Sequence, residues 1–220
     1  MPRTNYIIGV FDSGVGGLSV AKAIEKELPA STVIFRDDSQ HMPYGNKSAS
    51  EILPFIITIL DDLIEQGCEV IVIACNTVST TLIQKIRQAY DIPFVAIEPM
   101  VKPAAALTKT KTIAVCATPT TLASPRYLEL KHEFASGIKV LEPDCSDWSE
   151  LIENNKINKD HITAVIEPAL KAGADVIVLG CTHYHWIEDQ ITDLAAGKAE
   201  IIQPEAAVVG QLKRVLAQLT

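Results

Sequence analysis

The order of apolar and polar positions repeats once along this chain. Residues 67–77 (GCEVIVIACNT) and 173–183 (GADVIVLGCTH) share one pattern at a constant offset, because 173 − 67 = 106 and 181 − 75 = 106. Each copy holds a continuous β-branched apolar run, which is typical of a strand buried on both faces of a parallel sheet. Each run ends on a cysteine, Cys75 or Cys181, followed by small polar residues. Since ligands of open α/β sheets bind beyond the carboxyl ends of strands, we predict two thiols facing each other across one cleft.

The remaining segments alternate short apolar runs with amphipathic stretches. The pattern predicts further strands at residues 6–11, 32–35, 92–97, 112–118, 138–141 and 200–202. It predicts helices at residues 18–28, 48–66, 78–90, 126–134, 148–154, 161–172, 184–194 and 204–219. Residues 112–118 resemble residues 8–13 at an offset of 113 − 8 = 105, so the duplication extends beyond the cysteine strands. We therefore expect an α/β fold of two similar halves with right-handed crossovers, joined near Pro99 and Pro103.

Composition narrows the class of protein. The chain has 220 residues, 48% of them hydrophobic and 21% charged, as in ordinary soluble globular proteins. A net charge of −8 disfavours nucleic acid and anionic membranes as partners. No apolar run approaches the roughly 20 residues that span a bilayer, and the N-terminus does not resemble a signal peptide. The odd count of five cysteines does not indicate a disulfide framework, so a cytoplasmic location is expected.

A glycine-rich turn follows the first predicted strand at residues 12–17 (DSGVGG). It departs from the dinucleotide fingerprint because Ser19 stands where the third glycine is required, and the Asp12 carboxylate would repel a phosphate. The turn is better suited to let backbone N–H groups approach a small ligand such as a carboxylate, with Asp12 facing a cationic or protic group. The alternative is that Asp12 only caps the following helix.

A second loop carries a tyrosine between two residues that restrict the backbone. Tyr44 lies between Pro43 and Gly45, which exclude a strand interior. Tyr44 is thus either a rigid pocket wall with a hydroxyl group or a surface side chain.

Three kinds of chemistry could use Cys75 and Cys181. A zinc site requires three or four ligands, and only His183 is close in sequence, so no metal is expected. A Cys–His hydrolase requires one nucleophile and gives no reason for a second cysteine. A proton-transfer pair uses both thiols, one removing a proton from a carbon and the other returning one to its opposite face, with Asp12 beside Cys75 and His183 beside Cys181 as polar partners. Two buried structural cysteines remain the plain alternative.

Several motifs together resemble one family. The segments DSGVGGL (12–18), PYG (43–45), CNT (75–77), EPMVKPA (98–104), TLAS (121–124) and GCTHY (180–184) are similar to those of the glutamate racemases of the cofactor-independent aspartate/glutamate racemase superfamily, in order from residue 7 to about residue 210. The resemblance implies two pseudo-symmetric α/β lobes, 1–98 with 207–220 and 99–206, with the active site between them. It also implies interconversion of L- and D-glutamate without pyridoxal phosphate, supplying D-glutamate for peptidoglycan. A homodimer is left open.

The resemblance also implies roles for particular residues. Cys75 and Cys181 correspond to the two acid/base residues. Positions that contact substrate in the family correspond to Asp12, Ser13, Tyr44, Gly45, Asn76, Thr77, Thr182 and His183, and Thr118 and Thr121 are expected to line the pocket. Glu153 corresponds to an assisting carboxylate, and Asp12 and His183 are expected to take part in catalysis.

Some positions depart from the family pattern. His185 and Trp186 follow Tyr184 where Pro and Leu are usual, and Gln203–Pro204 replaces an Asp–Ser pair. Relatives are also expected to carry a further C-terminal segment that closes over the first lobe. Because these departures lie outside the cysteine motifs, we expect the chemistry to be retained. The alternatives are a relative acting on aspartate or another small acid, and a paralogue that binds an amino acid without turnover.

Overall fold

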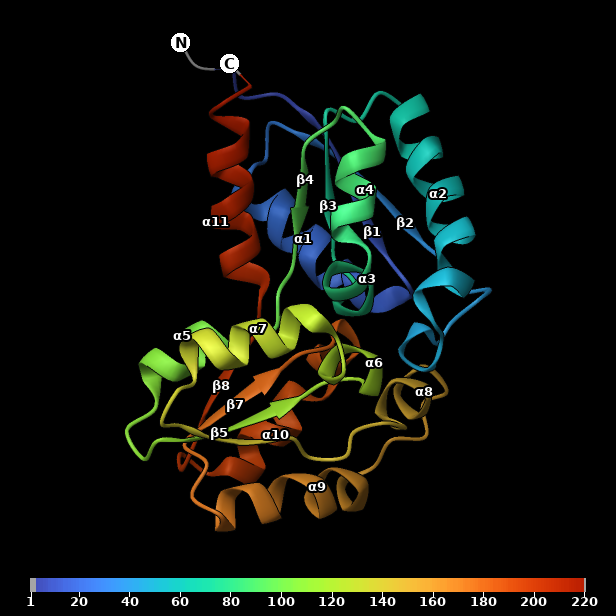
Figure 1. Cartoon of the computed structure of the whole chain (residues 1–220). Helices are drawn as coiled ribbons and strands as arrows, with labels where there is room; N and C mark the ends of the chain where they lie inside the picture. The colour runs from blue at the N-terminus through green and yellow to red at the C-terminus, as the bar shows by residue number, and fades with distance from the viewer. Residues whose placement is uncertain (1–2, 220) are drawn as a thin grey trace. The chain divides into compact units, whose positions relative to one another are not determined.

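The chain forms two units of the same design. The computed structural model describes residues 3–219. Contacts between Cα atoms group the chain up to Ile97 with the segment from Glu205 onward, and group Glu98–Pro204 separately. Each unit has a four-stranded sheet whose strand pairs are all parallel, with helices on both faces (Figure 1). The predicted α/β class and the duplication are confirmed.

The first unit has the strand order β2-β1-β3-β4. Its strands are β1 (Ile7–Asp12), β2 (Thr32–Asp37), β3 (Val70–Ile73) and β4 (Phe94–Ala96). Its helical segments are η1 (Val15–Gly17), α1 (Leu18–Glu27), η2 (Tyr44–Asn46), α2 (Ala49–Glu65), α3 (Asn76–Thr81), α4 (Ile83–Ala89) and α11 (Glu205–Leu216). Val70 and Val72 pack with α1 and α11, whereas Ile71 and Ile73 pack with α2, α3 and α4. Burial on both faces explains the unbroken apolar run of β3.

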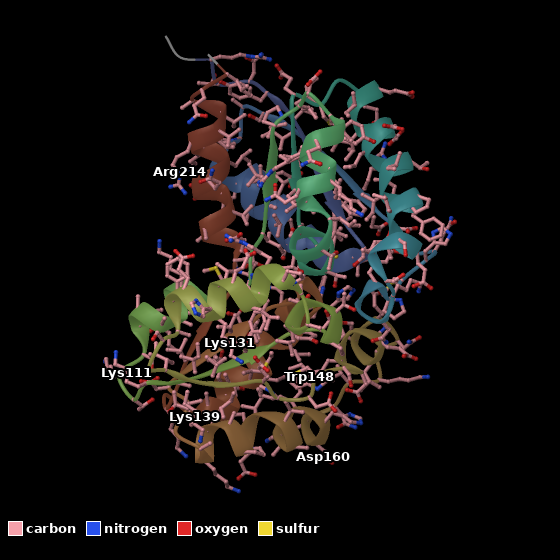
Figure 2. All side chains as sticks on the ribbon, viewed as in Figure 1. Lys111, Lys131, Lys139, Trp148, Asp160 and Arg214 are labelled. Atoms are coloured by element: carbon pink, nitrogen blue, oxygen red, sulfur yellow. The ribbon has the colours of Figure 1, made fainter. Side chains whose placement is uncertain are left out.

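The second unit repeats this arrangement with the order β6-β5-β7-β8. Its strands are β5 (Thr112–Cys116), β6 (Lys139–Leu141), β7 (Val176–Leu179) and β8 (Glu200–Ile202). Its helical segments are α5 (Val101–Leu107), α6 (Pro119–Leu122), α7 (Pro125–Phe134), α8 (Trp148–Glu153), α9 (Lys159–Lys171), η3 (Thr182–Ile187) and α10 (Glu188–Ala195). Trp148 is buried within the unit, whereas Lys111, Lys139 and Asp160 lie on its surface (Figure 2).

The duplication extends to how each cysteine strand begins. Gly67 and Gly173 have φ values of +83° and +94° in the turns before β3 and β7, a region that glycine enters without steric cost. The residue before each strand is a carboxylate, and 175 − 69 = 106. Glu69 accepts from the Ile7 amide at 3.1 Å, and Asp175 accepts from the Lys109 and Thr110 amides at 2.7 and 2.9 Å. These hydrogen bonds attach the start of each central strand to the backbone of the segment beside it, at Ile7 in the first unit and at Lys109 and Thr110 in the second.

Two predicted helices differ from the structure. The predicted helix 78–90 is broken at Leu82 into α3 and α4, because Thr80 and Thr81 hydroxyls donate to the Asn76 and Thr77 carbonyls at 2.8 and 2.6 Å and compete with regular helix geometry. The predicted helix 184–194 begins instead with the 3₁₀ segment η3. Among residues 3–219, no helix is long and apolar enough to cross a membrane.

Candidate functional site

In the first unit, Asp12 and Cys75 lie at the same edge of the sheet. β1 and β3 are hydrogen-bonded neighbours with Phe11 opposite Ile73, so the residues that follow them emerge side by side. Cys75 is 4% exposed, and its thiol donates to Ser13 Oγ at 3.4 Å. The structure thus places three of the predicted site residues at one sheet edge.

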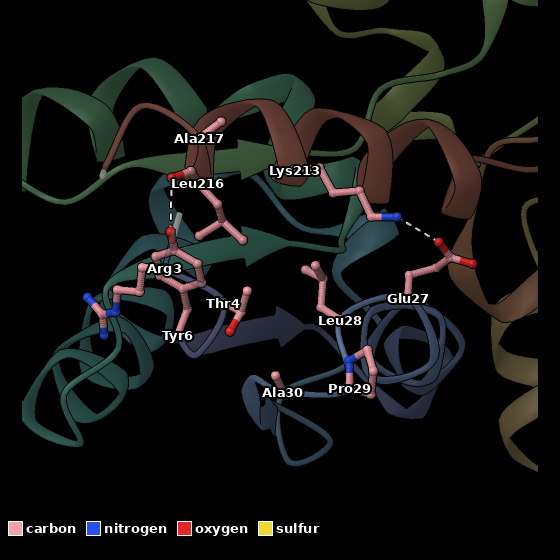
Figure 3. Close-up of a pocket in the computed structure, with 10 residues that line it drawn as sticks. All are labelled: Arg3, Thr4, Tyr6, Glu27, Leu28, Pro29, Ala30, Lys213, Leu216 and Ala217. Atoms are coloured by element: carbon pink, nitrogen blue, oxygen red, sulfur yellow. Dashed lines mark hydrogen bonds and ion pairs between the residues drawn. The ribbon is translucent and has the colours of Figure 1, made fainter. Parts of the chain in front are cut away.

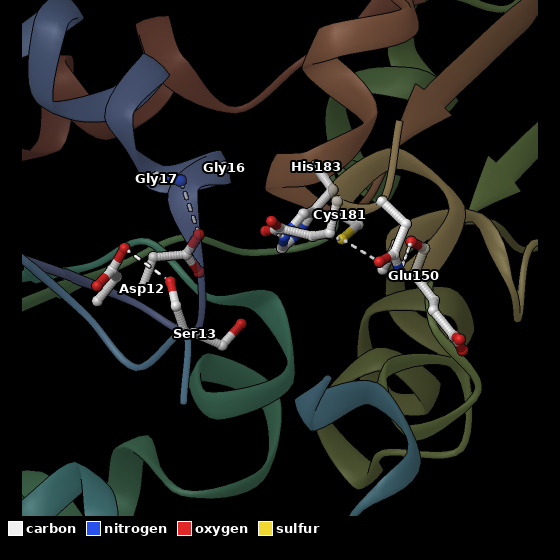
Figure 4. Close-up of polar contacts among 12 residues, drawn as sticks. Asp12, Ser13, Gly16, Gly17, Glu150, Cys181 and His183 are labelled. Atoms are coloured by element: carbon white, nitrogen blue, oxygen red, sulfur yellow. Dashed lines mark hydrogen bonds and ion pairs between the residues drawn. The ribbon is translucent and has the colours of Figure 1, made fainter. Parts of the chain in front are cut away.

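Asp12 is fully buried and is fixed by the turn that follows it. Its Oδ2 accepts from the Gly17 amide at 2.7 Å (Figure 4). A Cβ atom on Gly17 would lie 2.5 Å from the Asp12 Cβ, so only glycine fits there. Asp12 therefore does satisfy a backbone amide near the start of α1, as the capping alternative expected. The requirement for glycine at position 17 was not predicted, although the Gly16–Gly17 pair was a signal.

Tyr44 belongs to the buried interior of the first unit, which excludes the surface alternative. It is 1% exposed and packs in the same core cluster as Cys75. Its hydroxyl donates to Asp38 Oδ2 at 2.5 Å, and Asp38 Oδ1 lies 2.7 Å from His41 Nδ1. Burial, followed by the Asp38 carboxylate, raises the pKa of Tyr44 far above its ordinary value, so Tyr44 stays a neutral donor. Asp38 and His41 were not predicted, although the acidic pair 37–38 before Tyr44 was a signal.

The amide of Asn76 is the polar group in the first unit that most clearly needs an external partner. Asn76 follows Cys75 and is 4% exposed. Among the described residues, no protein group hydrogen-bonds its Oδ1 or its Nδ2. Buried amide groups without partners are costly, so this side chain is suited to a bound polar ligand.

In the second unit, Cys181 lies at the end of β7 and has two polar neighbours. Its Sγ is 3.6 Å from Nδ1 of His183, which lies beside it in Figure 4, and 3.5 Å from Ser149 Oγ. His183 is 3% exposed, and its Nε2 lies 2.5 Å from Glu153 Oε1. Glu153, His183 and Cys181 thus form a continuous chain in which the carboxylate orients the imidazole toward the sulfur. Ser149 was not predicted, and no sequence pattern marks it.

The strand beside β7 brings the predicted threonines to the same edge of the second sheet. Cys116 pairs with Leu179, and the Gly180 amide donates to the Cys116 carbonyl at 2.7 Å. Thr118 follows at this edge, and its hydroxyl lies 3.0 Å from that of Thr121. Both are buried, as are the other predicted positions Gly45, Thr77 and Thr182.

Three further cysteines are not among the predicted site residues. All five are free, and Cys68, Cys116 and Cys145 are buried. Burial raises the pKa of Cys68 to about 11, and the hydrogen bond with Cys116, followed by burial, raises the pKa of Cys145 well above its ordinary value. Both are therefore protonated, inert thiols near neutral pH. Within residues 3–219, no group of three or more His, Cys, Asp or Glu side chains is arranged to hold a metal ion.

Two of the departures from the family pattern contact each other. His185 Nδ1 lies 3.1 Å from Gln203 Oε1, and Trp186 is 51% exposed. Two residues that depart from the family pattern, His185 and Gln203, therefore contact each other.

A pocket of about 520 Å³ lies elsewhere in the first unit (Figure 3). It is lined by Tyr6, Leu28, Leu216 and their neighbours. Tyr6 precedes β1, whereas Asp12 ends it, so this pocket lies at the opposite end of the strand from the cysteine site. None of the predicted site residues lines it.

The fold and these local arrangements define a class of protein, a duplicated parallel α/β protein with a polar-flanked cysteine at the end of one central strand in each unit. The chain belongs to the Asp/Glu/Hydantoin racemase family, whose model matches residues 8–212. It is 40% identical over 215 residues to glutamate racemase of Pseudomonas aeruginosa, covering 96% of this chain and 81% of that protein.

Solved structures agree with this membership. Escherichia coli glutamate racemase, in complex with L-glutamate, matches with a TM-score of 0.89 and 30% identity, over 96% of this chain and 82% of that one. Francisella tularensis glutamate racemase, in complex with D-glutamate, matches with a TM-score of 0.82 and 28% identity, over 99% and 83%. The predicted resemblance is confirmed.

Proposed function

We propose that this protein is a glutamate racemase that interconverts L- and D-glutamate and so supplies D-glutamate for peptidoglycan synthesis. The observation that carries the proposal is the repeated arrangement of Cys75 and Cys181, each buried or half-buried at a strand end beside a hydroxyl group. Relatives about 40% identical over nearly the whole chain are glutamate racemases, and solved relatives bind each enantiomer of glutamate.

The proposed reaction uses the two cysteines as a base and an acid. One thiolate removes the α-proton of glutamate, leaving a carbanion delocalised into the substrate carboxylate, and the other thiol donates its proton to the opposite face. After one turnover the two cysteines have exchanged protonation states, and the reverse reaction starts from that state. A free thiol has a pKa of about 8.5, so the site has to favour the thiolate in one cysteine at a time.

The neighbours of each cysteine have distinct proposed roles. Ser13 accepts from the Cys75 thiol and orients it. Glu153 and His183 assist Cys181, because an imidazole held by a carboxylate can donate to the sulfur as it ionises. Asp12 lies at the same sheet edge as Cys75, and we assign it a role in binding the protic α-amino group.

Substrate binding is assigned to the polar groups at the two sheet edges. Asn76 supports this most directly, because its buried amide can both donate to a carboxylate and accept from an ammonium group. The other assigned contacts are Ser13, Tyr44, Gly45, Thr77, Thr118, Thr121, Thr182 and His183, all of them buried.

The proposal also covers the functional domains of the chain, its need for a cofactor and its location in the cell. Lobes 1–98 with 207–220 and 99–206 are proposed as the functional domains, each supplying one acid/base cysteine. No cofactor is required, because the carbanion is formed directly from the free amino acid. A cytoplasmic location suits five free cysteines.

The test is incubation with L-glutamate in D₂O without added cofactor, following the α-hydrogen by NMR and the optical rotation. We expect deuterium to enter Cα while the rotation decays to zero. L-Aspartate is the matched substrate control, and faster exchange with aspartate would reassign the substrate. Glutamate binding measured by calorimetry, without any exchange, would contradict the enzymatic proposal and indicate a non-catalytic amino-acid-binding protein.

A further inference from the structure

Helix α8 supplies two side chains to the loop that carries Cys181. Ser149 and Glu153 are four residues apart and so lie on one face of the helix. Glu153 reaches the loop through His183, whereas Ser149 reaches the sulfur directly, with Oγ 3.5 Å from Cys181 Sγ. The proposed function gives Glu153 a role in assisting Cys181 but assigns no role to Ser149.

Ser149 is held firmly in this position. It is 7% exposed, and the preceding residue, Trp148, is fully buried with its ring edge-on to Tyr184, at a centroid distance of 5.2 Å and an angle of 75°. The Tyr184 hydroxyl donates to the Cys145 carbonyl at 3.0 Å. These contacts fix α8 against η3, so the distance between the serine hydroxyl and the sulfur is set by packing.

The hydroxyl of Ser149 can bond to the sulfur in both protonation states of Cys181, because a hydroxyl group is both a donor and an acceptor. The neighbouring Tyr184 does not change its charge in this step, because burial raises the pKa of Tyr184 far above its ordinary value and keeps the phenol neutral. When Cys181 is a thiol, Ser149 can accept from it. When Cys181 is a thiolate, the same hydroxyl can turn and donate to the sulfur.

The hydroxyl group that contacts the cysteine comes from different structural elements in the two units. In the first unit Ser13 lies 3.4 Å from Cys75, directly after β1. The equivalent position in the second unit is Thr118, since 13 + 105 = 118, and its hydroxyl bonds to Thr121. Ser149 comes from a helix outside this correspondence.

We propose that Ser149 is a positioning residue for Cys181, whose hydroxyl holds the sulfur in place and donates to it once its proton has left. This role rests on the proposed racemase function, in which Cys181 exchanges a proton in every turnover. Ser149, on α8, then has the same role for Cys181 that Ser13 has for Cys75.

Several titratable groups surround this sulfur, and the test has to separate them from Ser149. They are His183 and Tyr184 on η3, Glu153 on α8, Cys145 before α8, and Cys116 at the end of β5. All of them are retained when residue 149 alone is exchanged, so a change in the reactivity of Cys181 reports on the hydroxyl.

The experiment compares Ser149→Thr with Ser149→Val, which have the same shape and differ in the hydroxyl. The full chain is alkylated with iodoacetamide across a pH series without substrate, and each cysteine peptide is quantified by mass spectrometry. We expect the Val variant to raise the pH of half-maximal Cys181 alkylation by about one unit, because it lacks a hydrogen bond to a charged sulfur. The Thr variant should stay close to the parent protein.

Cys75 provides an internal control, and Ser13→Ala provides the reciprocal one. Ser149→Val should leave the Cys75 profile unchanged, and Ser13→Ala should shift Cys75 but not Cys181. If Ser149→Val does not fold, as judged by circular dichroism, Ser149→Ala takes its place. Equal Cys181 profiles in the Thr variant and the hydroxyl-free variant would overturn the proposal.

A failure of the proposed function is distinguishable from a failure of this inference. Absence of deuterium exchange with glutamate in the parent protein would overturn the racemase, whereas the alkylation profiles are measured without turnover. With an active racemase, the Val variant should lose kcat near neutral pH, partly recover it as the pH rises, and change KM little, whereas loss of packing alone would lower kcat equally at every pH.

Discussion

The carboxylate of Asp12 accepts a hydrogen bond from the backbone amide of Gly17 at 2.7 Å, which closes the turn after β1. The two residues approach so closely that a Cβ on Gly17 would meet the Asp12 Cβ at 2.5 Å. Gly17 therefore determines where the Asp12 carboxylate lies, at the sheet edge that also presents Cys75.

Gly17→Ala should displace this carboxylate. Because the clash involves the Asp12 Cβ and not the flexible end of a side chain, the turn must move, and we expect kcat/KM for glutamate to fall by about tenfold or more. The matched control is Gly210→Ala in α11, where the added Cβ meets nothing within 4 Å and alanine should stabilise the helix by about 0.5–1 kcal/mol. Racemisation kinetics and thermal unfolding of both variants check this, and equal activities would contradict it.

Cys75→Ala and Cys181→Ala should each abolish racemisation. Loss of one acid/base group is expected to lower kcat by about 10²–10⁴-fold. Each variant should still eliminate HCl from one configuration of 3-chloroglutamate, since that reaction needs a single base, and the two variants should prefer opposite configurations at Cα. Cys68→Ala is the control, because this buried thiol precedes β3 and so lies at the opposite end of that strand from Cys75. Full racemase activity in either site variant would refute the two-base proposal.

Glu153→Gln should weaken the support of His183 for Cys181. The carboxylate lies 2.5 Å from His183 Nε2, and the amide removes its charge while keeping its shape. We expect kcat to fall by about 10-fold or more, since charge-assisted hydrogen bonds are about twice as strong as neutral ones. Glu150→Gln, at an exposed position of the same helix, should leave kcat within about twofold. Similar losses in both variants would show that the charge of α8, and not the contact, matters.

Tyr44→Phe should destabilise the first unit. The hydroxyl donates to Asp38 at 2.5 Å, and Asp38 is only 6% exposed, so the deletion leaves a buried carboxylate short of a donor. We expect a loss of about 1–3 kcal/mol in the free energy of unfolding. Tyr90→Phe removes a similar hydrogen bond, 2.8 Å to the exposed Asp61, and should cost about 0.5 kcal/mol or less. Urea unfolding of the two variants provides the comparison.

Asp175→Asn should change how stability depends on pH. Burial alone would raise the pKa of Asp175, but hydrogen bonds from Thr108, Thr110 and Lys109 outweigh it and lower the pKa to about 2. A lowered pKa contributes stability that is present above the unfolded value of about 3.9 and is lost as the pH falls through the folded value.

The parent protein should therefore exceed Asp175→Asn in stability by about 1 kcal/mol at pH 7, after allowance for solvent screening of this half-exposed group. The difference should stay constant down to about pH 4 and shrink between about pH 4 and pH 2. Urea midpoints at a series of pH values check this. A difference that grew on acidification would contradict the assigned direction.

The sequence by itself was enough to predict the α/β architecture and the position of Cys75 and Cys181 at the ends of two equivalent strands. The runs ending at Cys75 and Cys181 are local signals, because a strand buried on both faces must be apolar at every position. The offset of 106 residues then predicted equivalent places in two parallel sheets, and the shared strand order agrees with that prediction. Gly67 and Gly173 indicated the turns before these strands.

Only the tertiary structure shows how side chains that are distant in the sequence come to lie beside Cys181 and His183. Ser149 and Glu153 are separated from Cys181 and His183 by 32 and 30 residues, and their contacts depend on Trp148 packing against Tyr184. Likewise, Asp38 became the partner of Tyr44 only through the fold of its loop. Local hydrophobic patterns specify which residues must be buried, but the positions of polar groups within the interior follow from how whole helices pack, which no local pattern encodes.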